Sequence, residues 1–180
     1  FRKCYWDNNI LSINANINYI LIDRCSCNLD FRSNYLQRII ARNSKISDSP
    51  GGSNSSNYVF YNCNLYARSG WGIGIGITNK WSAHFYGTFY NCILNSNNYY
   101  MGNPNDSQAI TVLINCLYNV QNDYVDDGCT TQNCYKYTDS SNKHIFDLNK
   151  EELQSNNFLG NDGTVVGCYG GKNPYTLSLR

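Results

Sequence analysis

The densest group of acidic side chains is Asp123, Asp126 and Asp127, within the segment Asn-Asp-Tyr-Val-Asp-Asp-Gly. Carboxylates at this spacing could bind Ca²⁺ through their oxygen atoms, or could act as the acid and the base of glycoside hydrolysis. An Asp-Gly pair is also typical of a solvated turn, which is the simpler interpretation. The three aspartates are therefore candidates for a catalytic or a calcium site, and the sequence indicates no other cofactor.

Aromatic side chains suggest a second kind of site, because exposed rings can stack on the faces of sugars while asparagine amides bond to sugar hydroxyls. Two long segments, 67–83 and 95–107, interrupt the repeat described below. They contain Trp71, Trp81, Tyr99 and Tyr100. In the alternative interpretation these rings only pad the flank of the molecule. We take them as candidate ligand-binding residues, with a polysaccharide as the candidate partner.

The nine cysteines do not have the spacing of a metal site or a catalytic site. Their odd number excludes complete pairing within the chain, no Cys-x-x-Cys occurs, and there are only two histidines, so a zinc site is not expected. Nothing in the sequence places a histidine beside a cysteine as its base. We expect most cysteines to be small buried hydrophobic residues, with a loop disulfide between Cys129 and Cys134 as an alternative.

A recurring motif, aromatic or aliphatic–x–Asn–Cys–x–aliphatic, organises the chain, with clear copies at Val59–Leu65, Thr88–Leu94 and Val112–Tyr118. The cysteine of each copy, or the serine that replaces it, serves as a marker. The markers are Cys4, Cys25, Ser44, Cys63, Cys92, Cys116 and Cys134. Their intervals of 18 to 29 residues are shorter and less regular than those of helical repeat families. They fit single turns of a wide parallel β-solenoid whose loops vary in length.

The motif has a physical interpretation within such a solenoid. Residues three apart, such as Phe60 and Cys63, both point inward only if the strand bends between them. Asparagine stands at this break, and it adopts left-handed backbone conformations more readily than most residues. Stacked about 4.8 Å apart, the amides would form a hydrogen-bonded ladder and the cysteines an inward column. The residues concerned are Asn43, Asn62, Asn91, Asn115, Cys25, Cys63, Cys92 and Cys116.

Segments such as FYNCNLYA and FYNCILNS resemble coils of the pectate-lyase-like right-handed β-helix superfamily. The tail is similar to the closing segment of extracellular β-helix surface proteins from Bacteroidetes-type bacteria, which commonly precedes a further domain. That similarity rests on Gly160-Asn161-Asp162-Gly163-Thr164-Val165-Val166-Gly167-Cys168-Tyr169-Gly170-Gly171. The resemblance implies an all-β, single-stranded, right-handed parallel β-helix (β-solenoid) of about six to seven coils over residues 1–141. Residues 142–180 would then be a cap that leads to a further domain.

The superfamily includes polysaccharide lyases and hydrolases, which makes a carbohydrate-active enzyme one expectation. The sequence departs from the polygalacturonase pattern, because it has no Gly-His-Gly or Arg-x-Lys element to accompany paired aspartates. It also has no recognisable lyase arrangement of arginine or lysine.

Near the C-terminus, the pattern of Phe146–Leu153 predicts a short helix or turn. We expect this element to cover the last coil and to shield its open edge.

The composition and net charge of the chain favour a folded, strand-rich protein and argue against nucleic acid and membrane as partners. The 29 asparagines and 16 tyrosines favour short strands joined by turns, and the 42% hydrophobic content argues against disorder. A net charge of +1 gives no field that would favour nucleic acid. No apolar run approaches the roughly 20 residues of a membrane span. The first residues already have the pattern of a strand, so we expect the chain to be a piece of a longer protein.

Three functions fit these observations. The first is a non-catalytic, structural or adhesive module of an extracellular protein, on a cell surface or a phage fibre, that contacts glycans. The second is a polysaccharide lyase or glycoside hydrolase. The third is a subunit of an extracellular polymer, in which identical copies stack end to end as a homo-oligomer. We favour the first, because folding accounts for nearly all of the repeat.

The ladder interpretation makes a testable prediction. We expect Asn91→Ala to lower the free energy of unfolding by about 1–2 kcal/mol, because the substitution removes buried amide hydrogen bonds. Thermal and chemical unfolding of the two proteins measure the difference. An unchanged melting temperature would contradict the interpretation.

Overall fold

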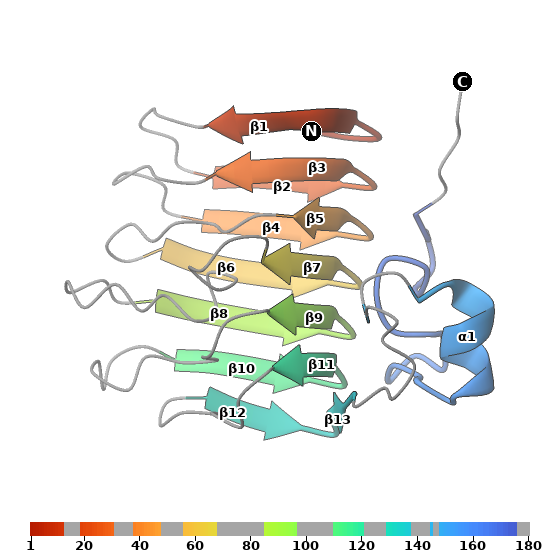
Figure 1. Ribbon diagram of the computed structural model, residues 1–180. Helices are drawn as coiled ribbons and strands as arrows, with labels where there is room; N and C mark the ends of the chain where they lie inside the picture. Colours follow the sequence, from red (N-terminus) through yellow and green to blue (C-terminus); the bar gives the residue numbers. More distant parts are fainter. Residues whose placement is uncertain are drawn as a thin grey trace.

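The computed structural model describes residues 1–12, 19–30, 38–47, 56–67, 85–96, 110–120, 129–137, 145 and 148–175. Strands dominate these residues, and they form two sheets in which every recorded pair of neighbouring strands is parallel (Figure 1). The prediction of an all-β parallel fold is confirmed at this level.

Within the described residues, sheet A has six strands in the order β12-β10-β8-β6-β4-β2. They are β2 Tyr19–Asp23, β4 Arg38–Arg42, β6 Ser56–Tyr61, β8 Phe85–Tyr90, β10 Ile110–Ile114 and β12 Cys129–Gln132. Sheet B has seven described strands in the order β1-β3-β5-β7-β9-β11-β13. They are β1 Tyr5–Ser12, β3 Ser26–Asp30, β5 Lys45–Ser47, β7 Asn64–Ala67, β9 Ile93–Ser96, β11 Leu117–Val120 and β13 Tyr135–Lys136. The chain alternates between the sheets, so equivalent strands stack in layers.

A two-residue bend joins each strand of sheet A to the following strand of sheet B, and we call this strand–bend–strand unit a rung. The second residue of each bend is the marker. The first residue has a positive φ in every described bend: Lys3 53°, Arg24 55°, Asn43 47°, Asn62 50°, Asn91 52°, Asn115 52° and Asn133 52°. The predicted left-handed bend is therefore confirmed. Asparagine recurs there because its short polar side chain tolerates this conformation at lower cost than most others.

The marker side chain holds its bend together through hydrogen bonds. The thiol of Cys63 donates to the carbonyl oxygen of Tyr61, two residues earlier, at 3.3 Å, and the other marker thiols make the same contact. The hydroxyl of Ser44 donates to the carbonyl oxygen of Arg42 at 2.7 Å and accepts the N–H of Cys25, one rung away, at 3.0 Å. A marker therefore needs a small side chain that both donates and accepts, which serine and cysteine supply. Our interpretation of the cysteines as simple hydrophobes is incomplete.

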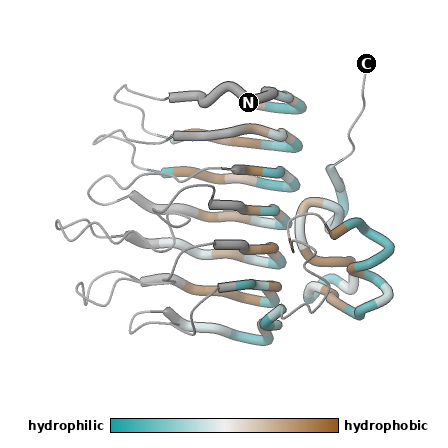
Figure 2. Tube along the Cα trace, viewed as in Figure 1, coloured by the Kyte–Doolittle hydropathy of each residue, from teal (hydrophilic) through white to brown (hydrophobic). Residues whose placement is uncertain are grey.

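Two inner columns of apolar side chains fill the space between the sheets. On sheet A, Phe60 lies in register with Phe89, and their rings stack in parallel with centroids 5.0 Å apart. Other members of this core are Ile20, Ile22, Ile39, Ala41 and Leu113 from sheet A, and Cys27, Ile46, Leu65 and Leu94 from sheet B. Figure 2 shows hydrophobic residues along the strands and hydrophilic residues at the bends. Each large buried side chain stabilises the stack by about 1.5–3 kcal/mol.

Residues 148–175, here called the closing segment, begin with helix α1 Lys150–Ser155. The helix starts with a capping box, in which the Asn149 side chain accepts the N–H of Glu152 at 2.9 Å and the Glu152 carboxylate accepts the N–H of Asn149 at 2.8 Å. Figure 1 shows the segment beside the bends, along the flank of the stack. We predicted that Phe146–Leu153 would cover the last rung, and that cover stays a prediction. In the closing segment, Phe158 packs against Tyr135 and Tyr137 of the last described rung, and Gly170 and Asn161 bond to earlier rungs.

The closing segment lies on the flank because it covers apolar side chains on the outer side of sheet B. Ile93 and Leu117 are fully buried, although they lie on the outer side of sheet B. Side chains around the closing segment cover them, namely Ile145, Leu148, Leu153, Val165 and Val166. Without this cover, two rungs would expose large aliphatic side chains to water.

The hydrogen bonds of the markers predict that loss of the buried Ser44 hydroxyl lowers the stability of the protein. We expect Ser44→Ala to lower the free energy of unfolding by about 1–3 kcal/mol, because the Arg42 carbonyl and the Cys25 N–H lose their partner inside the core. Ser44→Cys restores the marker found in the other rungs and should retain most of the stability. Denaturant titration of the three proteins tests this. If alanine and cysteine gave the same midpoint, the proposed role of the marker bond would be wrong.

Candidate functional site

The residues that the sequence suggested for chemistry lie outside the described part of the chain. These are the aspartates Asp123, Asp126 and Asp127, and the aromatic residues Trp71, Trp81, Tyr99 and Tyr100. Their roles as catalytic, calcium-binding or sugar-binding groups stay predictions. The asparagine and cysteine positions of the motif are described, and the structure shows which contacts they make.

Two of the motif asparagines direct their amides at the closing segment. The Nδ2 of Asn43 donates to the carbonyl oxygen of Gly170 at 2.9 Å. The Nδ2 of Asn91 donates to Oδ1 of Asn161 at 3.2 Å, and the N–H of Asn161 donates back to Oδ1 of Asn91 at 3.3 Å. The close approach also explains a glycine: Gly171 has φ of +75°, and a Cβ there would collide with the Asn62 amide. The amide ladder itself stays a prediction.

A second column, formed by the first residues of the sheet B strands, also contacts the closing segment. The N–H of Cys168 donates to Oδ1 of Asn64 at 2.8 Å, and Lys45 Nζ lies 4.9 Å from the ring centroid of Tyr169. A Cβ on Gly167 would collide with the Asn64 side chain, and φ is +80° there. These polar groups hold the closing segment on the flank and leave little free for a ligand.

The cysteines are poor candidates for a nucleophile. Burial raises the pKa of the Cys168 thiol to about 12, and burial also raises the pKa of Cys27. A reactive cysteine needs a lowered pKa and access to its substrate. Cys116 meets only the first condition: burial acts to raise its pKa, hydrogen bonds with Cys134 and Cys92 outweigh burial and lower it, and the side chain is fully buried. Cys134 is a free thiol that donates to the carbonyl oxygen of Gln132 at 3.4 Å, so the alternative of a disulfide with Cys129 is wrong.

The structure brings together a group that the sequence analysis did not single out. Four basic residues lie in the first three bends or immediately before them, around Asp23, and we call them the basic edge: Arg2, Lys3, Arg24 and Arg42. Arg2 pairs with Asp23 in a parallel bridge, and Asp23 lies in register with Arg42. The N–H of Lys3 donates to the carbonyl oxygen of Asp23 at 2.8 Å. The backbone N–H of Arg24 donates to the carbonyl oxygen of Arg42 at 3.0 Å.

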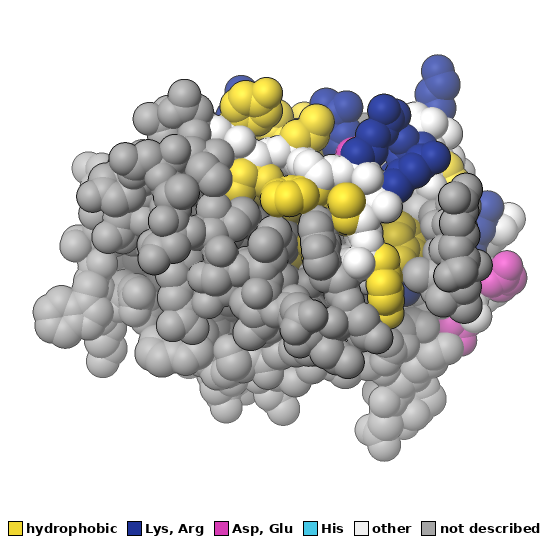
Figure 3. Space-filling model, turned by 90° about the horizontal axis from the view of Figure 1, so that it is seen from above, with side chains coloured by type: hydrophobic (Ala, Val, Ile, Leu, Met, Phe, Trp, Pro, Cys, Tyr) yellow, Lys and Arg dark blue, Asp and Glu magenta, His cyan; other side chains and the backbone are white. Residues whose placement is uncertain are grey.

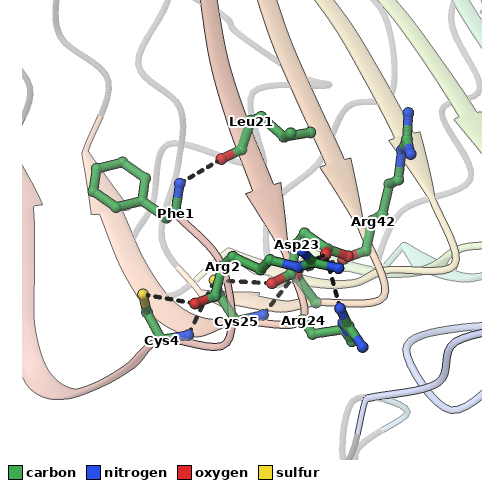
Figure 4. A network of polar contacts seen from close by, with 9 residues as sticks. Phe1, Arg2, Cys4, Leu21, Asp23, Arg24, Cys25 and Arg42 are labelled. Atoms are coloured by element: carbon green, nitrogen blue, oxygen red, sulfur yellow. Dashed lines mark hydrogen bonds and ion pairs between the residues drawn. The ribbon is translucent and has the colours of Figure 1, made fainter.

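One carboxylate within the basic edge faces two guanidinium groups (Figure 4). Oδ2 of Asp23 lies 3.1 Å from Nε of Arg2 and 3.3 Å from Nη2 of Arg24. Lys3 and Arg42 are exposed, and neither forms an ion pair with an acidic residue of the described chain. In Figure 4 the guanidinium of Arg42 points away from Asp23. The basic edge therefore keeps a positive excess on its accessible side.

A groove of about 290 Å³ lies beside the basic edge, and it is lined by Phe1, Arg2, Leu21, Asp23 and Arg42. It combines guanidinium donors, a carboxylate acceptor and apolar walls. Viewed from the end that carries the first bends, Figure 3 shows hydrophobic side chains next to a group of basic ones. Such a groove can bind a ligand that has hydroxyl groups, an apolar face and negative charge.

The backbone shows that two of these basic residues occupy strained positions. In the rungs further along the stack, the left-handed position of the bend is asparagine, whereas the first two bends carry Lys3 and Arg24. Long side chains visit this region less readily than asparagine does, at a cost of roughly 1–2 kcal/mol. The Nε atom of Arg24 is also buried and has no hydrogen-bond partner within the described residues. At the first two bends, the left-handed position therefore carries lysine or arginine instead of the asparagine that this conformation favours.

Comparisons with known proteins found no matching family model, no similar curated protein and no similar solved structure. The described part of the chain contains no helix that is long and apolar enough to span a membrane. Among the same residues, no three His, Cys, Asp or Glu side chains gather where they could hold a metal ion.

Strain at the first bend predicts that a substitution there can stabilise the protein. We expect Lys3→Asn to raise the free energy of unfolding by up to about 1 kcal/mol, because asparagine adopts the left-handed conformation more readily. The reverse exchange at an equivalent bend, Asn133→Lys, should lower it by a similar amount. Melting curves of the two variants measure both changes. A lower melting temperature for Lys3→Asn would contradict the strain argument.

Proposed function

We propose that the chain is a non-catalytic module of an extracellular protein, on a cell or virion surface, with a structural or adhesive role that includes contact with glycans. Its two parallel sheets would belong to a right-handed β-helix of about six to seven coils, of the pectate-lyase-like kind. The observation that carries the proposal is the outer face of sheet A, which is regular, partly apolar and accessible.

Exposed side chains of this face include large apolar ones. Tyr19 is 65% exposed, Leu21 41% and Tyr61 39%. The rings of Tyr61 and Tyr90 stack at 4.9 Å between centroids, with 7° between their planes. Because these outward positions repeat at the spacing of parallel strands, about 4.8 Å, the face suits an extended partner with repeating units. Sugar chains have apolar ring faces and hydroxyl edges that match such a surface.

An enzymatic role is the second candidate, and the described groove supports it poorly. Glycoside hydrolysis generally uses two carboxyl groups on opposite sides of the bond, about 5–10 Å apart. Asp23 supplies a single carboxylate to the described lining, and its Oδ2 is already bonded to Arg2 and Arg24. We therefore place binding ahead of catalysis.

End-to-end polymerisation is opposed by the last described rung. Thr131 lies in register with the core residue Leu113, and Lys136 lies in register with Tyr118, which packs on the core. Both Thr131 and Lys136 are exposed. A second copy stacked on this end would bury polar side chains in the apolar column, at a cost in free energy. Polar residues at the ends of a repeat array are a common means of preventing such growth.

A glycan array combined with a reducing-sugar assay tests the proposed function. We expect the chain to retain one or more glycans on the array and to release no reducing ends from them, because the groove offers contacts without a second described carboxylate. Asp23→Asn should not change the background of sugar release. Release of reducing ends by the wild-type chain would favour the enzymatic alternative. Absence of both binding and release would contradict glycan contact.

A further inference from the structure

We propose that the marker thiols at the two ends of the stack are redox sites, at which a small-molecule disulfide such as oxidised glutathione links neighbouring rungs. The first pair is Cys4 with Cys25, and the last pair is Cys116 with Cys134. Each new disulfide would fasten a terminal rung covalently to the rung beside it. These sites are separate from the glycan contact proposed above, and neither proposal depends on the other.

The marker thiols of neighbouring rungs contact one another at both ends. The backbone N–H of Cys116 donates to Sγ of Cys134 at 3.4 Å, and the N–H of Cys4 donates to Sγ of Cys25 at the same distance. The two thiols within each pair also hydrogen-bond with one another. Neighbouring parallel strands are about 4.8 Å apart, which lies within the Cα separations of about 4.4–6.8 Å that disulfides span. Each pair can therefore close with a small movement.

Position in the column of markers decides which thiols can pair. On the side away from Cys4, the N–H of Cys25 donates to the hydroxyl of Ser44 at 3.0 Å, so Cys25 meets a hydroxyl there and not a thiol. Cys134 belongs to the last described rung, and its neighbour in the column is Cys116. Among the described markers, each of the two outermost thiols therefore has a single partner.

Exposure separates the ends of the column from its interior. Cys4 and Cys134 are partly exposed, whereas Cys63 and Cys92 are fully buried. An oxidant in solution can thus reach one thiol of each end pair. Cys92 lies between Cys63 and Cys116, so a bond there would draw together rungs that are held on both sides. The last described rung has partner strands on one side among the described residues, and it can follow such a movement.

The last pair combines access with reactivity. Burial acts to raise the pKa of Cys116, but hydrogen bonds with Cys134 and Cys92 outweigh it and lower the pKa, which favours the thiolate. The bond with Cys116 and burial raise the pKa of Cys134, so the shared proton stays on the exposed partner. In the first pair, burial raises the pKa of Cys25. We therefore expect the last pair to react faster than the first.

The reaction is a thiol–disulfide exchange in two steps. The sulfur of Cys134 attacks one sulfur of oxidised glutathione while its proton passes to the thiolate of Cys116, and the first glutathione thiolate leaves. Cys116 then loses this proton and attacks Cys134 in the mixed disulfide, which releases the second glutathione thiolate. Overall, the thiol pair loses two electrons and two protons, and oxidised glutathione leaves as two molecules of reduced glutathione.

A disulfide at each end would hold the rungs that open most easily. Strand β13 consists of Tyr135 and Lys136, and both residues are exposed. The partners are 21 residues apart in the first pair and 18 residues apart in the last pair. Closing a loop of this size lowers the entropy of the unfolded chain and thereby stabilises the folded one. Oxidation should therefore suppress opening of the ends, and reduction should release them.

Treatment of the reduced 180-residue chain with oxidised glutathione tests the inference. After the remaining thiols are alkylated, proteolysis and mass spectrometry should find Cys116 linked to Cys134 and, later in the reaction, Cys4 linked to Cys25. The oxidised chain should melt roughly 5–15 °C above the reduced chain. Dithiothreitol should reverse both the links and the shift in melting temperature.

Serine provides matched variants, because Ser44 already serves as a marker and makes the marker hydrogen bond. Cys134→Ser should abolish the link to Cys116 and leave the link of the first pair. The control, Cys63→Ser, makes the same exchange at an interior marker and should leave both links. Melting curves of the reduced variants show that each is folded.

Three results would overturn the inference. The first is a folded chain whose end pairs stay reduced in excess oxidised glutathione. The second is a link from Cys116 to Cys92 in place of the link to Cys134. The third is a melting temperature that falls, or stays the same, when the links form. Glycan binding on the array is measured independently of all three.

Discussion

The two-residue bend between the sheets is the constraint on which the rest of the structure depends. Its first residue must adopt a left-handed conformation, and its second must carry a small donor that bonds to the carbonyl oxygen two residues earlier. This geometry turns the chain sharply while both neighbouring strands keep their apolar side chains inside. Because every described rung repeats it, the backbone bonds of one bend pair with the next, and the parallel register follows.

Repetition of the bend decides where function can reside. The inward positions are taken by the core, and the amides of Asn43 and Asn91 are taken by the closing segment. The closing segment in turn covers the outer side of sheet B near Ile93 and Leu117. What stays accessible in the described part of the chain is the outer face of sheet A and the first bends. The accessible surface of the described residues is therefore built mainly from repeated outward positions of the strands.

The basic edge illustrates a conflict between folding and binding. Asparagine satisfies the left-handed backbone at most bends, while Lys3 and Arg24 accept strain and bring charge. The ion pairs of Asp23 with Arg2 and Arg24 offset part of the cost of crowding cations on adjacent rungs. Stability and charge therefore compete for the same backbone position. Such competition is expected where binding rather than folding decides the residue.

The sequence by itself determined the features that repeat locally. The motif predicted parallel stacked strands, the markers, and a left-handed bend at Asn62 or Asn91, because each depends on residues only a few positions apart. Three features were decided by the tertiary structure. They are the flank position of the closing segment, the hydrogen bond between the N–H of Cys25 and the Ser44 hydroxyl of the next rung, and the basic edge. Each depends on which residues of successive rungs become neighbours, and loops of unequal length conceal that register in the sequence. Arg2, Asp23 and Arg42 are about 20 residues apart in the chain and adjacent only after the rungs stack.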